Sequence, residues 1–185
     1  MGSGCDDNDD GGSGNRFPVR PFEPNEWRIY RSIRLEALRE APNAFAMSYE
    51  ESAARGDAKW LDRPKEARPD QLPLAVFEGD RAVGLCWVLF ADLDPATAHL
   101  IQMWVAPDVR GFGLSRSMLL ASIEWARENN VERMVLGVTQ GGIPARRFYE
   151  SMGFRAEGPS EPSREGSTLR IDNMSLVLTP EEVVG

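Results

Sequence analysis

A cationic, glycine-broken turn is the stretch of this 185-residue chain whose residue types most directly suggest chemistry. The turn consists of Arg110, Gly111, Phe112, Gly113, Leu114, Ser115 and Arg116. Glycines let a ligand come close to the backbone, and the first amides of a helix have no intrahelical acceptor. The helix dipole and the arginine charges favour an anion at the same place. The turn therefore predicts a site for a pyrophosphate.

The segments on either side of this turn have the patterns of a strand and a helix. Apolar and polar residues alternate from His99 to Val105, and Pro107 ends that pattern. From Leu114, apolar residues recur at helical spacing until Asn129. A glycine-rich turn alone is equally typical of a simple tight turn, but this strand, turn and helix follow one another in the order that builds a phosphate site.

Two segments resemble signatures of the GCN5-related N-acetyltransferases, the GNAT family. Residues 103–115 (MWVAPDVRGFGLS) are similar to the coenzyme A pyrophosphate signature, and residues 145–154 (ARRFYESMGF) to the last signature. Residues 31–51 resemble the amino-terminal helices of many bacterial members. The resemblance covers about residues 17–178.

The resemblance implies acetyl-CoA (coenzyme A) as cofactor, with its pantetheine arm lying between two splayed parallel strands. The first of these two strands would bind the cofactor through Met103, Trp104 and Val105. The main chain of Met103 and Val105 would hold pantetheine. The amides from Gly111 to Arg116 would hold the pyrophosphate, and Arg110 and Arg116 could pair with it. Gly142 stands where many members have an asparagine, so a side-chain contact to pantetheine or to an ordered water is missing.

The resemblance also implies catalytic residues. Tyr149 stands where family members often have the tyrosine that protonates the coenzyme A sulfur; the alternative is a packing tyrosine. His99 stands where several members carry a glutamate base, although a histidine at a strand start is often structural. The other candidate bases are Glu50, Glu51, Asp92 and Asp94, and the choice between them stays open.

The resemblance therefore implies an N-acetyltransferase that transfers the acetyl group of acetyl-CoA to a primary amine by direct attack in a ternary complex. The acceptor would be a small-molecule amine or a protein amine, and relatives commonly form homodimers. The alternative function is a non-catalytic acetyl-CoA-binding sensor or interaction domain.

Composition and charge exclude several other classes of protein. The net charge is −8, and four of these charges come from the aspartates of residues 6–10, which leaves −4 elsewhere. This balance argues against nucleic acid as a partner. The sequence contains no apolar run of membrane-spanning length and no secretion signal, so we expect a cytoplasmic protein. Only Cys5 and Cys86 are available, so we expect no disulfide and no metal site.

We predict an α/β fold: one domain over residues 16–180, after a disordered acidic Gly/Ser leader over residues 1–15. A central mixed, twisted sheet of about six to seven strands would have helices on both faces and a splay between its two central parallel strands. The expected strands are residues 17–22, 74–77, 82–90, 99–105, 134–138, 154–157 and 169–178, and residues 159–163 are expected to form a loop. The expected helices are residues 23–38, 114–128 and 144–152, with a short helix or loop and a further helix between residues 43 and 63. Arg31, Arg34 and Arg39 are expected on a solvated or salt-bridged helix face.

Overall fold

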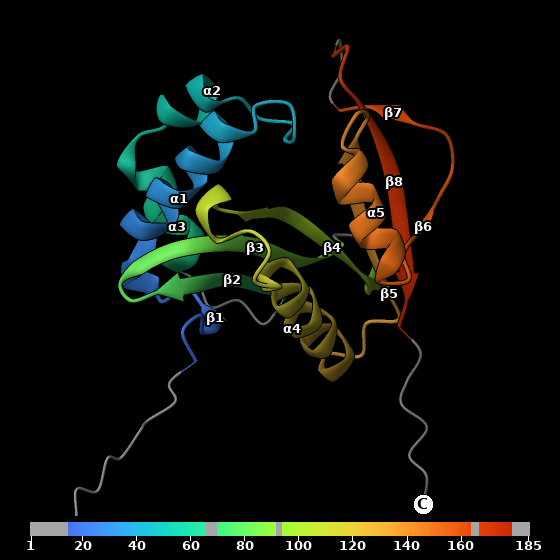
Figure 1. The fold of residues 1–185 in the computed structure, drawn as a ribbon, viewed down its shortest axis with the longest axis horizontal. Coiled ribbons are helices and arrows are strands. Elements are labelled where there is room, and N and C mark those ends of the chain that lie inside the picture. The colour runs from blue at the N-terminus through green and yellow to red at the C-terminus, as the bar shows by residue number, and fades with distance from the viewer. Residues whose placement is uncertain (1–14, 66–69, 92–93, 164–166, 179–185) are drawn as a thin grey trace, which may run out of the picture.

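The computed structural model describes residues 15–65, 70–91, 94–163 and 167–178, and its strands form one mixed sheet (Figure 1). The strand order is β1-β2-β3-β4-β5-β8-β6, and β7 pairs with β8 beside this path. The strands are β1 (Val19–Pro21), β2 (Gln71–Glu78), β3 (Arg81–Ala91), β4 (Asp94–Val105), β5 (Arg133–Thr139), β6 (Arg155–Ala156), β7 (Glu161–Pro162) and β8 (Arg170–Val177). The leader expected over residues 1–15 lies almost entirely outside the described residues.

Five α-helices accompany the described part of the sheet. They are α1 (Trp27–Glu40), α2 (Tyr49–Ala53), α3 (Asp57–Lys65), α4 (Leu114–Glu128) and α5 (Ile143–Ser151), with 3-10 turns at Pro24–Glu26 and Pro107–Val109. The short turn at Pro24 carries a capping box between Glu23 and Glu26, so the regular helix begins later than expected. No helix in the described ranges is long and apolar enough to cross a membrane.

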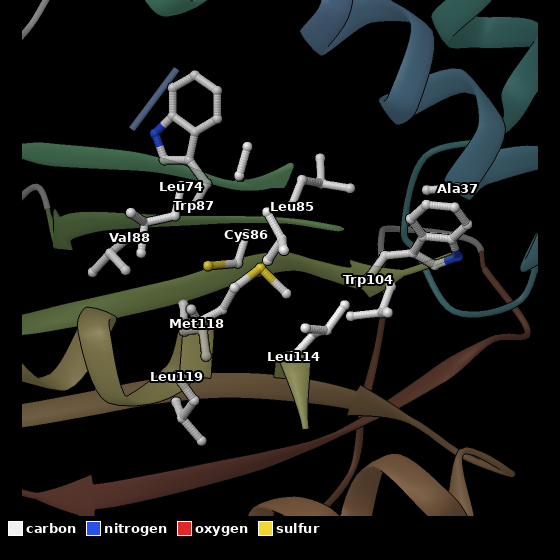
Figure 2. Packing of buried hydrophobic residues seen from close by; sticks show 14 of the residues in the cluster. Ala37, Leu74, Leu85, Cys86, Trp87, Val88, Trp104, Leu114, Met118 and Leu119 are labelled. Atoms are coloured by element: carbon white, nitrogen blue, oxygen red, sulfur yellow. The ribbon is translucent and has the colours of Figure 1, made fainter. Parts of the chain in front are cut away.

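Helices cover both faces of the sheet, as the apolar patterns predict. The ring of Tyr30 on α1 lies 5.2 Å from that of Trp87 on β3, so α1 packs on the face that Trp87 presents. Figure 2 shows Cys86 and Met118 together on the other side of β3, with Trp87 pointing away from them. Sγ of Cys86 lies 3.6 Å from Oγ of Ser122 on α4. Adjacent strand residues face opposite ways, so α1 and α4 lie on opposite faces.

The predicted fold class is confirmed, with two differences of detail. Residues 161–162, which we expected within a loop, form the short strand β7 against Arg170 and Ile171 of β8, and so the described sheet has eight strands. The first strand is shorter than expected and begins at Val19, while Phe17 is buried just before it. Both differences concern edge strands, where short-range pattern is weakest.

The two central parallel strands pair over a short stretch only. The pairs between β4 and β5 are Thr97 with Arg133, Ala98 with Met134, and His99 with Val135. Beyond them β4 continues along β3, whereas β5 continues along β8. The predicted splay is therefore present, and it begins at His99.

A β-bulge lies in β4 just beyond the point of divergence. The register with β3 shifts between Leu85 and Trp87, and Gln102 opposite has a φ of 61°. The Tyr30 hydroxyl donates to Oε1 of Gln102 at 3.0 Å. A bulge bends its strand, and this one lies on the part of β4 that has no partner residues in β5.

Candidate active site

A cavity of about 410 Å³ opens where β4 and β5 diverge. The strands contribute Leu100, Ile101, Gln102 and Met103 on one side, and Leu136, Gly137, Val138, Thr139 and Ile171 on the other. The remaining wall consists of Arg34, Ala44, Phe45, Ala46, Met47, Gly142, Ala145 and Tyr149. The cavity therefore reaches from the α1–α2 region through the gap between the strands to α5.

The main chain of β4 presents polar groups to this gap. The amide of Ala106 donates to the carbonyl of Val83 on β3 at 2.8 Å. Amides alternate in direction along a strand, so the amide of Val105 points away from β3, toward the side where β5 has already diverged. Main-chain groups without a neighbouring strand can pair with an extended ligand.

The glycine-broken turn borders a second hollow, of about 360 Å³, next to the end of β4. Gly111 and Gly113 have φ values of 90° and 77°, a region that other residues adopt at a cost. Among the described residues, no acceptor within hydrogen-bond distance is found for the amides from Gly111 to Arg116. Ser115, Arg116 and Phe148 also line this hollow, which combines free donors with the positive end of α4.

Two side chains of the turn are occupied elsewhere in the protein. Nη2 of Arg110 lies 2.8 Å from Oε2 of Glu40, and Nε of Arg110 donates to the carbonyl of Val105 at 3.0 Å. The side chain of Phe112 packs on Phe17, with ring centroids 5.3 Å apart. Leu114 is buried in the core. At these positions an anion could bind mainly to the main chain of the turn and to the half-exposed charge of Arg110.

The Glu40 carboxylate connects this turn to α1. It accepts hydrogen bonds from Arg110 and, at 2.9 Å, from Nε1 of Trp104. The Arg110 and Trp104 hydrogen bonds hold the pKa of Glu40 below its ordinary value, so it is ionised near neutral pH. The anion turn is thus attached to the helix that borders the main cavity.

Tyr149 on α5 points into the main cavity and is 7% exposed. Within the described ranges its hydroxyl makes no hydrogen bond to another residue. Burial, followed by the nearby Cys86, raises the pKa of the phenol well above its ordinary value. Tyr149 therefore keeps its proton at neutral pH and presents it to the cavity.

His99 lies on the opposite face from Tyr149. It pairs with Leu89, which is two residues from Trp87 and so faces the α1 side. Its side chain is exposed and borders a third hollow of about 430 Å³ with Arg133, Glu157 and Asn173. The structure does not bring His99 and Tyr149 into one cavity. The two hollows share four wall residues, Leu100, Ile101, Leu136 and Gly137.

Three other candidate bases, Glu50, Glu51 and Asp94, do not line the main cavity. Glu50 and Glu51 are exposed on α2, where Glu51 completes a capping box with Ser48. Asp94 accepts from the amide of Ala96 and the hydroxyl of Thr97 at the start of β4. Asp92 lies outside the described residues.

Arg34 is a site residue that the sequence did not single out. We expected it on a solvated or salt-bridged face; it is not solvated, because it is 7% exposed, and it lines the main cavity. Its guanidinium carbon lies 4.3 Å from the ring centroid of Phe45. The available signal was its position beside Ile33 on the apolar stripe of α1, because a charged residue on such a stripe is often functional.

Comparison with known proteins agrees with this geometry. The sequence model of the acetyltransferase (GNAT) family matches residues 31–154, about two thirds of the chain. This chain belongs to the GNAT family. The match contains the divergence of β4 and β5, the anion turn and Tyr149.

The chain matches only part of the length of its curated relatives. A mycothiol acetyltransferase of Pseudarthrobacter chlorophenolicus is 26% identical over 140 residues, which cover 74% of this chain and 42% of that protein. An N-acetylaspartate synthetase of Danio rerio is 38% identical over 68 residues, which cover 37% of this chain and 24% of that protein. The chain thus spans less than half the length of these two relatives.

Solved GNAT structures share the fold over most of the chain. An acetyltransferase of Streptococcus pneumoniae superposes with a TM-score of 0.75 at 15% identity, covering 88% of this chain and 99% of that one. A putative acetyltransferase of Salmonella typhimurium, solved with its cofactor acetyl-CoA, has a TM-score of 0.72 at 20% identity and covers 88% and 94%.

Proposed function

We propose that this GNAT member is an acetyl-CoA-dependent N-acetyltransferase that transfers the acetyl group directly to a primary amine. The observation that carries the proposal is the gap between β4 and β5, which opens beside the unpaired amides of Gly111 to Arg116. A GNAT neighbour solved with acetyl-CoA supports the same cofactor here.

The residues present fit this cofactor. Unpaired amides at the start of a long helix suit a diphosphate, and the gap suits the amide-bearing pantetheine arm, which would pair with the main chain of Met103 and Val105. Gly142 adds no side chain, and a Cβ there would lie 3.0 Å from the carbonyl oxygen of Thr139. Pantetheine would therefore depend on main-chain contacts.

The side chains around the gap divide the proton transfers between the two faces of the sheet. When bound, acetyl-CoA supplies an activated thioester. Tyr149 holds a proton on Oη on the α5 side, where a leaving sulfur would need it. An aliphatic amine with a pKa of about 10.4 must first lose its proton. We assign that task to His99, acting through water from the opposite face.

Substitution of Tyr149 by Phe tests this function. With a panel of primary amines, we expect amine-dependent release of the coenzyme A thiol by the wild type and a fall in kcat of about 10²-fold or more in the variant. The KM for acetyl-CoA should change little, because the hydroxyl is not needed to bind the cofactor. The absence of hydrogen bonds from Oη to other described residues means that the variant should fold normally.

Tyr49→Phe is the matched control, because Tyr49 on α2 lies outside the cavity. Equal kcat for wild type and Tyr149→Phe would make Tyr149 a packing residue. Tight acetyl-CoA binding without release by any amine would favour the sensor function instead.

A further inference from the structure

The α1 side of the main cavity carries positive charge. Of the described residues in its lining, only Arg34 is charged, and no carboxylate is among them. On the same wall, Phe45 and Met47 are apolar and partly buried. Arg34 itself is buried, and charges interact more strongly away from water.

This charge distribution disfavours a polycationic acceptor. A polyamine would bring additional ammonium groups beside Arg34, and the described lining has no acid to neutralise them. An acceptor that carries an anionic group would instead be attracted to the guanidinium.

The setting of Arg34 also suits a planar anion. Stacking on Phe45 at 4.3 Å restrains the plane of the guanidinium. A guanidinium has five N–H donors, so it can donate hydrogen bonds to a carboxylate while keeping its interactions with the protein. The planar fork of the guanidinium matches the two oxygens of a planar carboxylate.

We propose that the acceptor is a primary amine that bears a carboxylate, and that Arg34 binds this carboxylate and so determines acceptor specificity. This inference rests on the proposed function and names the substrate class of the same cavity. The carboxylate would lie on the α1 side, which leaves the amine directed toward the gap where β4 and β5 diverge.

Pairs of acids and amides test the proposal. We would measure coenzyme A release with alanine, β-alanine and aspartate, and with alaninamide and β-alaninamide as uncharged counterparts. Spermidine and phosphoethanolamine complete the panel as polycation and phosphate. For the wild type, we expect kcat/KM at least tenfold higher for each acid than for its amide, and lower values for spermidine and phosphoethanolamine.

Arg34→Gln should raise the KM for the acids at least tenfold while changing the amides by less than threefold. Arg34→Lys should recover part of the preference, because it keeps the charge and loses the bidentate fork. The acid-to-amide ratio is internal to each variant, so it does not depend on the folded fraction. Arg39→Gln, on the same helix but outside the cavity lining, is the matched control.

Calorimetry on the coenzyme A complex separates this inference from the proposed function. If acids bind in a way that depends on Arg34 but no amine is turned over, the inference about Arg34 holds and the proposed enzyme function is wrong. The inference would be overturned if acids and amides were turned over or bound equally well, or if spermidine or phosphoethanolamine were preferred. It would also be overturned if Arg34→Gln left the turnover and binding of acids unchanged. Failure of every carboxylated probe to bind would overturn it as well.

Discussion

Gly137 on β5 shapes the candidate site by having no side chain. It lines both the main cavity and the hollow beside His99. A Cβ at this position would lie 2.5 Å from Cγ2 of Ile171 on β8, closer than carbon atoms approach. Because it has no side chain, the glycine leaves room for Ile171 in the wall that the two hollows share.

Gly137→Ala should crowd the wall between the main cavity and the hollow beside His99. We expect the added methyl group to displace Ile171, to lower the free energy of unfolding by about 1–3 kcal/mol and to reduce kcat/KM about tenfold. Chemical denaturation and coenzyme A release measure the two effects. The double variant Gly137→Ala/Ile171→Ala, compared with Ile171→Ala alone, should recover most of the activity. No recovery would mean that crowding at Ile171 is not the cause.

At the scale of the element, the bulge of β4 depends on a single unusual residue. Gln102 has a positive φ, which costs a non-glycine residue about 1–2 kcal/mol, and its side chain accepts from Tyr30. Tyr30 is itself packed between Trp60 and Trp87. Helix α1 therefore supports the bulge that lies beside the gap.

Substitutions at Gln102 separate backbone strain from the hydrogen bond. Gln102→Val should lower the free energy of unfolding by about 1–3 kcal/mol and abolish most turnover, because a β-branched residue resists positive φ. Gln102→Gly loses the same hydrogen bond but relieves the strain, so it should remain within about 1 kcal/mol of wild type and retain more activity. Equal effects of the two variants would contradict a role for the backbone conformation.

At the scale of the whole molecule, two groups with raised pKa values meet in one core. Burial raises the pKa of Cys86 from 9.0 to about 12 and also raises that of Tyr149. The folded protein then holds these protons more tightly than the unfolded chain does. The stability that this proton binding contributes is fully present below about pH 9 and is lost as the pH rises toward the folded pKa of Cys86, about 12.

Cys86→Ala should make this alkaline loss shallower. A group that ionises only on unfolding contributes up to about 1.4 kcal/mol per pH unit, so the wild type should lose stability faster than the variant between pH 9 and pH 12. Urea denaturation at several pH values measures the difference. Parallel curves for the two proteins would show that Cys86 does not contribute, and Ser122→Ala, which removes the thiol's neighbour but keeps the thiol, serves as the control.

The sequence alone determined those features that depend on local pattern. Gly111 and Gly113 adopt positive φ, which glycine does without strain, and the helical spacing of apolar residues predicts α4. The anion turn could therefore be predicted without knowledge of distant contacts. The same is true of the β2–β3 hairpin and of the placement of Tyr149 on a short helix after Pro144. These elements together also indicated the mixed sheet.

Only the tertiary structure decided what the site encloses. The burial of Arg34, the face on which His99 lies and the pairing of Arg110 with Glu40 depend on residues far apart in the chain. A helix pattern assigns a charged residue to an apolar or polar stripe, but its exposure follows from what packs against that stripe. Strand register likewise sets which side chains share a cavity, because a shift of one residue reverses every side chain.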